Sequence, residues 1–122
     1  IVGGMDKLEG AVGVTPLVNY PWKGTQPFVE RYKKIYNEDP GSEAGLNYMG
    51  LYVVAKAMEL AGSVTDAQAI SAKFDEAAKA LPPDQMPYPL TGVDDKGHFV
   101  SDVVASIVTD GKLEPVPIPR AQ

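Results

Sequence analysis

One long apolar run constrains what this chain can fold into more than any other feature of its sequence. Residues 46–61 are apolar or aromatic apart from a few polar positions: Asn47, Lys56 and Glu59. The run falls short of the roughly 20 residues that a bilayer-spanning helix needs. We therefore expect a helix over residues 44–61 that is opened by Ser42 and Glu43. Gly62 would end it, and its apolar character on nearly every side predicts that most of its faces are covered.

The residues before that run predict a strand, a crossover and a helix. Small and β-branched apolar residues at 8–17 predict a short buried strand. Residues 18–24 mix Asn, Pro and Gly with two large aromatics, which suits a segment that crosses between structural units. A helix over residues 27–37, capped by Thr25 or Gln26, should follow. Its apolar face would consist of Phe28, Val29, Tyr32, Ile35 and Tyr36.

The residues after that run predict one more helix and a terminal set of strands. Residues 65–68 match a capping box, and an apolar stripe continues to residue 81, so we expect one amphipathic helix. A strand over 88–93, a turn at 94–97 and a longer strand over 99–108 should follow. The last segment should not pair as a central strand, because prolines cannot donate ladder hydrogen bonds: Pro115, Pro117 and Pro119.

Composition disfavours several classes of function. The net charge is -5 and no basic stripe is present, which argues against nucleic acid as a partner. The sequence has no cysteine, so disulfides, thiolate nucleophiles and cysteine metal sites are excluded. His98 is the single histidine, with no nucleophile pattern near it, and the glycines match neither phosphate-loop pattern. We expect no cofactor, no metal and no catalytic site, with His98 a solvated turn residue.

The length and the first residues of the chain suggest part of a larger protein. With 122 residues, 44% of them apolar, the chain can bury the core of one domain or lobe and not of two. Residues 1–4 (IVGG) contain neither an initiator Met nor a signal-peptide pattern. We therefore expect the chain to begin within a longer protein.

Several motifs occur in the order and spacing of one known family. Residues 48–62 (YMGLYVVAKAMELAG) combine a Tyr, a small residue two positions on, an apolar stretch and an Ala-Gly end. Residues 28–40 carry F-x-x-x-Y, a later Tyr and Asp-Pro, and residues 89–98 and 108–112 carry P-x-x-x-x-D-x-x-G-H and V-x-D-G-K. Together these motifs resemble the C-terminal portion of the type I periplasmic binding proteins. The matching branch is the branched-chain amino acid ABC transporter substrate-binding family, also described as extracellular ligand-binding receptors.

The resemblance covers residues 8–116 and implies an α/β fold, a fragment of two three-layer α/β/α lobes joined by crossings. In that arrangement residues 1–17 end one lobe with a strand, and residues 18–26 form the crossover. Residues 27–98 supply helices and a short strand of the other lobe. Residues 99–122 return as terminal strands and a tail. The implied hinge contains Pro16, Asn19 and Tyr20.

The segment from residue 41 to residue 48 is the predicted place of ligand contact. Free N–H groups at a helix N-terminus can receive an anion, and the resemblance implies that the loop before Tyr48 faces the cleft between the lobes. The predicted ligand-binding residues are Ser42, Glu43, Asn47 and Tyr48. Two alternatives stay open: Ser42 and Glu43 as plain helix caps, and Tyr48 as a core residue.

The resemblance implies a non-enzymatic receptor, the solute-binding component of an ABC importer. It would capture a small molecule, an amino acid or an aromatic or aliphatic carboxylate, between two lobes by hinge closure. Its other partners would be ABC permease subunits and the remainder of the same precursor as a complementary chain, in the periplasm. The alternatives are a cytoplasmic ligand-sensing regulator of the same fold, and a small hydrolase or transferase. Because the cleft needs both lobes, we expect the chain alone to bind solute weakly or not at all.

Overall fold

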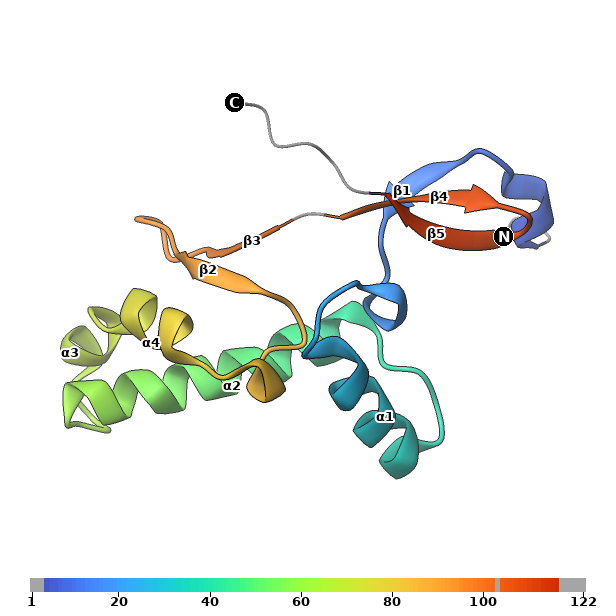
Figure 1. Ribbon diagram of the computed structural model, residues 1–122. Helices are drawn as coiled ribbons and strands as arrows, with labels where there is room; N and C mark the ends of the chain where they lie inside the picture. Colours follow the sequence, from blue (N-terminus) through green and yellow to red (C-terminus); the bar gives the residue numbers. More distant parts are fainter. Residues whose placement is uncertain (1–3, 103, 117–122) are drawn as a thin grey trace.

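The computed structural model describes residues 4–102 and 104–116, which form a helical region and a separate three-stranded sheet (Figure 1). The helices are α1 (Thr25–Tyr36), α2 (Ser42–Ala61), α3 (Ala67–Ser71) and α4 (Phe74–Ala80). Short 3-10 helices are η1 (Met5–Leu8), η2 (Leu17–Asn19) and η3 (Pro83–Gln85). The strands are β1 (Val12–Val14), β2 (Leu90–Val93), β3 (Phe99–Ser101), β4 (Ala105–Thr109) and β5 (Lys112–Val116). The chain is thus of mixed α/β class.

The apolar run forms α2, the longest element of the fold. Gly62 ends it in the left-handed conformation, with a φ of 62°, and its N–H donates to the Glu59 carbonyl, as the sequence predicts. The buried residues repeat every fourth position: Gly45, Met49, Val53 and Ala57. Leu51 on another face is 73% exposed, so the expectation that most faces are covered is wrong for this chain. None of the described helices has both the length and the apolar character that a membrane crossing requires.

Helix α1 begins at Thr25, earlier than the sequence suggests. Gly24 is its N-cap, so the prediction that Thr25 or Gln26 caps the helix is wrong. The buried Thr25 hydroxyl instead donates to the Pro87 carbonyl at 2.8 Å, a tertiary contact that the local pattern does not reveal. The predicted apolar face is buried at Phe28 and Val29. Its outer end stays exposed: Ile35 and Tyr36.

The third predicted helix is divided into α3 and α4. Asp66, not Thr65, is the N-cap, and its carboxylate accepts the N–H of Gln68 at 3.1 Å. After one and a half turns the backbone tightens, because the N–H of Lys73 donates to the carbonyl of Ile70, three residues back. The expectation of one continuous helix is therefore wrong, and the tight turn separates the two short helices.

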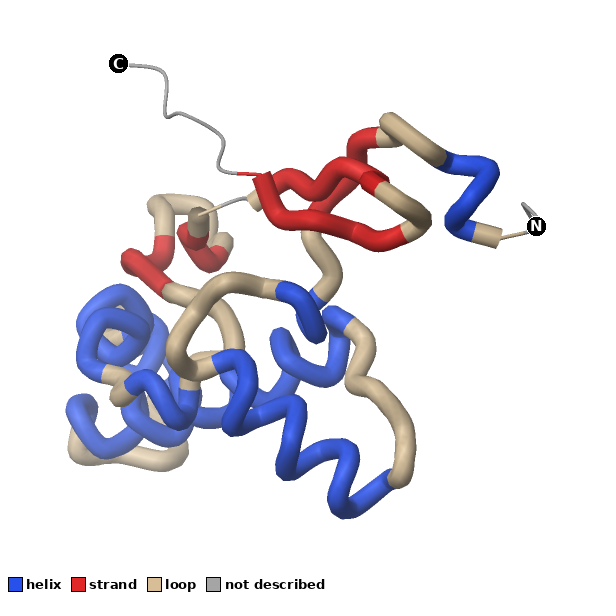
Figure 2. The backbone as a smooth tube through the Cα atoms, turned by 45° about the vertical axis from the view of Figure 1, so that its right-hand side comes forward, coloured by secondary structure: helices blue, strands red, loops and turns tan. Residues whose placement is uncertain are grey.

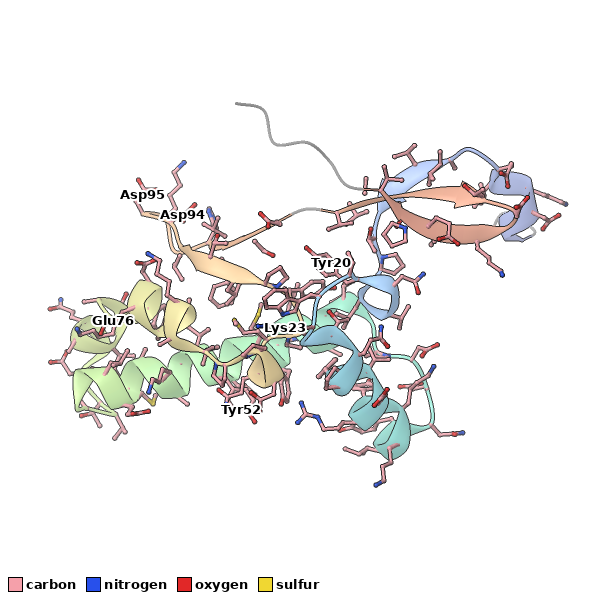
Figure 3. The ribbon with its side chains drawn as sticks, viewed as in Figure 1. Tyr20, Lys23, Tyr52, Glu76, Asp94 and Asp95 are labelled. Atoms are coloured by element: carbon pink, nitrogen blue, oxygen red, sulfur yellow. The ribbon has the colours of Figure 1, made fainter. Side chains whose placement is uncertain are left out.

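β2 and β3 form the predicted hairpin, with Asp94 and Asp95 at its tip (Figure 3). Asp94 accepts the N–H of His98 at 2.7 Å, and this bond holds the pKa of the Asp94 carboxyl below its usual range. His98 itself is exposed, as predicted. On the helical side, Asp75 of α4 accepts the N–H of Val93 at 3.0 Å, which fastens the hairpin to the helices.

The predicted strand over residues 99–108 is divided between two sheets. β3 pairs with β2, whereas β4 lies between β1 and β5 in a sheet of order β1-β4-β5. The continuous strand is therefore wrong, because the chain passes from the helical region to the other sheet within this segment (Figure 1). Pro115 lies in β5 at the edge of the sheet, as predicted, while Pro117 and Pro119 fall outside the described residues.

The three-stranded sheet has one covered face and one open face. Thr15, Ser106 and Val108 are buried on the covered side. On the open face Val12 and Val14 of β1 are 72% and 75% exposed. A strand does form within residues 8–17, but its predicted burial is wrong, because the described part of the chain leaves this face uncovered.

Candidate functional site

Two connections join the helical region to the three-stranded sheet, one after β1 and one before β4 (Figure 2). They lie side by side, since the Thr15 N–H donates to the Val104 carbonyl at 2.9 Å. The buried hydroxyls of Thr15 and Ser106 share a hydrogen bond of 2.8 Å. On the helical side, the Tyr20 hydroxyl donates to the Asp102 carbonyl. The two connections are therefore tied together at both ends.

A cavity of about 210 Å³ lies where these connections meet the beginning of α2. Apolar side chains form much of its wall: Val14, Leu46, Met49, Leu90, Phe99 and Val104. The remaining lining residues are Thr15, Tyr20, Ser42, Tyr88, Ser101 and Asp102. An apolar wall with a few convergent polar groups is the usual composition of a small-molecule site, and this volume admits only a small solute.

Two buried tyrosines supply phenol groups to this cavity. The rings of Tyr20 and Tyr88 meet edge to face with their centroids 4.9 Å apart, and Tyr20 lies between the two regions in Figure 3. Burial raises the pKa of both phenols. At Tyr88 a hydrogen bond with Ser42 opposes this effect, and the Glu43 carboxylate adds to it. Both phenols therefore stay neutral at pH 7, and Tyr20 uses its hydrogen in the bond to the Asp102 carbonyl.

Helix α2 reaches the cavity through Ser42 at its first turn. Gly41 is the N-cap, and no side chain caps this end of the helix. Ser42 and Glu43 are thus not the helix caps that the alternative interpretation requires. N–H groups of the first turn point outward, where the positive end of the helix dipole favours an anion.

The other predicted ligand-binding residues do not line this cavity. Glu43 is exposed and is not part of the cavity wall. Asn47 borders an open hollow on the surface of α2. Tyr48 faces α1, and its hydroxyl accepts a hydrogen bond from Arg31 Nη2 at 2.9 Å. Because a helix advances about 100° per residue, these neighbours in sequence are spread around α2. Of the four predicted ligand-binding residues, only Ser42 lines the cavity.

The predicted hinge residues lie together at the junction of the two regions. Pro16 precedes η2 in extended conformation. Asn19 Nδ2 donates to the Leu113 carbonyl of β5 at 3.4 Å, and Tyr20 contacts the second connection. All three therefore lie beside the two connections between the regions.

Comparison with known proteins bears on the fold. No protein-family model and no curated protein matches the sequence. Among solved structures, a leucine binding protein, LivK, from Thermotoga maritima matches 90% of this chain with 24% identity and a TM-score of 0.64. An ABC transporter substrate-binding protein from Desulfitobacterium hafniense matches 93% with 25% identity and a TM-score of 0.64. Both neighbours are type I periplasmic binding proteins.

The chain has part of the type I periplasmic binding protein fold. It spans about a third of the length of the two neighbours, 31% and 32% respectively. The resemblance predicted from the sequence motifs is therefore confirmed, as is the expectation of an α/β fragment of this fold. One neighbour is described as a leucine binding protein and the other as an ABC transporter substrate-binding protein.

Several of the residues that line the cavity do not follow from any local sequence motif. Leu46 and Met49 follow Ser42 at four and seven positions along α2, so helical periodicity could have placed them beside it. Thr15 and Tyr88 come from distant segments. No local pattern signals their approach, which depends on how the two connections meet α2.

Proposed function

We propose that this chain is the C-terminal portion of a periplasmic solute-binding protein that serves an ABC importer. The parent protein would capture an amino acid, or another small carboxylate, between two lobes that close about a hinge. A neighbour described as a leucine binding protein and another described as an ABC transporter substrate-binding protein support this class of function. The role is binding and release, with no covalent step.

The observation that carries this proposal is the position of the cavity. It lies between the two regions and is lined by Ser42 of α2, by Thr15 of the first connection and by Asp102 of the second. A ligand held there would contact both regions at once. Contacts to both are what make a closed arrangement more favourable when ligand is bound. The α2 N-terminus would receive the carboxylate, and the apolar wall would receive the side chain.

We assign the three-stranded sheet to one lobe and the helical region to the other. Leu17 is buried in the helical core, so we place the first crossing at Pro16 instead of over residues 18–26. Because β3 pairs with β2, we place the return crossing after Ser101 and not at residue 99. Strand β1 and the β4–β5 hairpin then belong to the same lobe.

In this proposal the paired connections act as the hinge. The bond between Thr15 and Ser106 lies on the sheet side, and the bond from Tyr20 to the Asp102 carbonyl lies on the helical side. The flexible stretch is then confined between them, around Pro16. Rotation of the lobes would turn both connections together, which is how a hinge of a few residues absorbs domain closure.

Open apolar faces support the proposal that the remainder of the same precursor covers this chain as a complementary chain. Val12 and Val14 on the sheet, and Leu51 and Val54 on α2, are exposed apolar side chains on two different elements. Such surfaces mark places where other protein packs. The loaded parent would then dock on ABC permease subunits from the periplasmic side.

Isothermal titration calorimetry with L-leucine tests the proposal. The chain alone should show weak binding or none. A longer polypeptide that contains this segment together with the rest of both lobes should bind leucine saturably. Tight leucine binding by the isolated chain would contradict the two-lobed site. If the longer polypeptide bound neither leucine nor any other amino acid or small carboxylate, the assigned function would be wrong.

Two serine variants of the longer polypeptide locate the site. Ser42→Ala should weaken binding about tenfold, the effect of losing one good polar contact. Ser71→Ala, at the exposed end of α3, is the matched control and should leave the affinity unchanged. Equal affinities for the two variants would move the ligand away from the α2 N-terminus.

A further inference from the structure

A second cavity, of about 440 Å³, lies between α1 and the first half of α2. Aromatic and aliphatic side chains and a single charged one line it: Phe28, Arg31, Tyr32, Ile35, Tyr36, Ala44 and Tyr48. On α2 it is bordered by Ala44 and Tyr48, which lie on a different face from Ser42 and Leu46. We call this space the α1–α2 groove, and it is separate from the cavity at the two connections.

The rings of the groove form a continuous series that runs onto α2. The ring centroids of Tyr36 and Tyr32 are 4.5 Å apart, and those of Tyr32 and Phe28 are 6.0 Å apart. The centroid of Tyr48 lies 4.9 Å from that of Phe28 and 4.9 Å from that of Tyr52. All four pairs are tilted, with interplanar angles between 44° and 58°. Such a wall can accept one more flat ring by stacking or edge contact. At its outer end Tyr36 is 60% exposed, which leaves the groove accessible.

Arg31 gives this apolar wall a fixed positive charge. Its Nη2 donates to the Tyr48 hydroxyl at 2.9 Å and to the Asp84 carbonyl at 3.1 Å, and its guanidinium carbon lies 5.6 Å from the centre of the Tyr48 ring. These contacts hold the guanidinium in one orientation, which reduces the entropy lost when it binds a further acceptor.

The charge of Arg31 is not neutralised within the part of the chain that the structure describes. The ion pairs found there do not include Arg31, and the groove wall holds neither Asp nor Glu. On the same helix, Lys33 forms an ion pair with Asp39 at 2.6 Å, so α1 carries one paired cation and, at Arg31, one without an acidic partner among the described residues. Both hydrogen bonds that Arg31 makes within the described residues use Nη2, and Nη1 remains for an anionic ligand.

We propose that the α1–α2 groove binds a small aromatic carboxylate, a single ring with one acid group. The ring would pack against Tyr32, Tyr36 and Tyr48, and the carboxylate would accept a charge-assisted hydrogen bond from Arg31 Nη1. The volume is more than sufficient for a ligand of this size, and one cation matches one anionic group. The site is additional to the solute cavity between the two regions and does not depend on the presence of both lobes.

Amide chemical shifts of the labelled chain, followed during titration with sodium benzoate, test this site. Benzoate should produce saturable shifts at Tyr32, Tyr36, Ala44 and Tyr48. Benzamide keeps the ring and lacks the charge, and cyclohexanecarboxylate keeps the charge and lacks the aromatic ring. Each should bind about tenfold more weakly than benzoate, because each loses one of the two contacts.

Paired variants separate the groove from general attraction of an anion. Arg31→Gln should abolish the preference for benzoate over benzamide. Lys23→Gln is the matched control, because Lys23 lies 5.4 Å from the Trp22 ring in a cation–aromatic pair outside the groove (Figure 3). This control should keep the preference. Tyr36→Leu, at an exposed position where the fold should survive, should weaken benzoate binding several-fold by removing one ring.

Three results would overturn the proposal. These are the absence of saturable shifts with benzoate, a benzoate preference that survives Arg31→Gln, and shifts centred on Tyr20 and Tyr88 instead of the groove. Shifts at the groove with a second protein, and none with benzoate, would identify a docking surface and also contradict a small-molecule site. Because these titrations use the chain alone, their outcome is independent of the leucine measurement on the longer polypeptide.

Discussion

The helical region and the three-stranded sheet differ in what holds them together. The helical region contains the connected hydrophobic core. Buried residues of this core come from η2, from all four α-helices and from β2. In the sheet, Val108 is buried at 3% exposure beside two buried hydroxyls, Thr15 at 2% and Ser106 at 0%. The sheet therefore depends on ladder hydrogen bonds and on its contacts with the rest of the chain.

The difference shows that one segment can supply a self-supporting part and a dependent part. Apolar burial stabilises by about 25 cal/mol per Å² removed from water, whereas a small sheet with one open face gains little from this source. In this account the helical region folds around its own core. The sheet becomes well packed when another part of the parent covers Val12 and Val14.

The largest expected effect comes from the centre of the helical core. Met49→Ala should lower the free energy of unfolding by about 2–5 kcal/mol, because Met49 is fully buried and the change leaves a cavity. Leu51→Ala, two residues along the same helix and 73% exposed, is the control and should change it by less than about 0.5 kcal/mol. Urea denaturation followed by far-ultraviolet circular dichroism measures both. Equal losses would mean that α2 does not bury this stripe.

Two glycines of α2 offer a sharper test of the packing. A Cβ on Gly45 would lie 2.7 Å from Leu17 Cδ2 and 3.3 Å from Tyr88 Cε2, so Gly45→Ala should destabilise by about 1–3 kcal/mol. At Gly50 the nearest atom, Phe99 Cε2, is 3.9 Å away. Gly50→Ala should therefore stabilise by up to about 1 kcal/mol through helix propensity. Urea denaturation gives the sign of the change in the free energy of unfolding for each variant. If both variants changed it in the same direction, the close contact at Gly45 would be refuted.

The link between α4 and the hairpin should appear as a dependence of stability on pH. A hydrogen bond with Lys79, together with the Val93 N–H, holds the pKa of Asp75 below its usual range. Asp75 therefore stabilises the fold at pH values above about 4, the usual Asp pKa, and this contribution disappears as pH falls through the lower folded pKa. Thermal unfolding between pH 6 and pH 3 should show a smaller decline for Asp75→Asn than for the unchanged chain.

Asp95→Asn serves as the control for that comparison, because Asp95 lies at the exposed hairpin tip (Figure 3). It should retain the full acid-dependent decline. If Asp75→Asn and Asp95→Asn declined alike, the bond between Asp75 and the hairpin would contribute nothing measurable.

The smallest expected effect lies on the open face of the sheet. In the isolated chain, Val12→Thr and Val14→Thr should each change the free energy of unfolding by less than about 0.5 kcal/mol, because both side chains are exposed. In the longer polypeptide the same substitutions would bury a hydroxyl, and each should cost about 1–3 kcal/mol. Equal effects in both proteins would show that this face is not covered by the parent.

The sequence predicted those elements whose local signals agree with their tertiary surroundings. Gly62 ended α2 as expected, and the hairpin turn followed Asp94, because backbone conformation and short-range hydrogen bonds determine both features. Thr25 failed as a cap because its hydroxyl serves a distant carbonyl. The strand over residues 99–108 was divided because its two halves pair in different sheets.

The candidate site was predicted less completely than the fold. Ser42 is a predicted ligand contact because helix starts carry a sequence pattern and offer free N–H groups, and it lines the cavity. Tyr88 and Thr15 reach the same cavity from remote segments, and their approach depends on the paired connections. For Tyr48 the sequence leaves ligand contact and a core position open, and its side chain lines the α1–α2 groove, since one helical residue faces one direction.

Native-state hydrogen exchange of the isolated chain tests the contrast between the two regions most directly. The amides of Met49 and Val53 in α2 should exchange only through global unfolding of the chain. The hydrogen-bonded amides of Thr15 and Val108 in and beside the sheet should exchange at least about tenfold faster, through local opening of the sheet. Equal opening free energies in both regions would contradict the division of this segment into a self-supporting helical part and a dependent sheet.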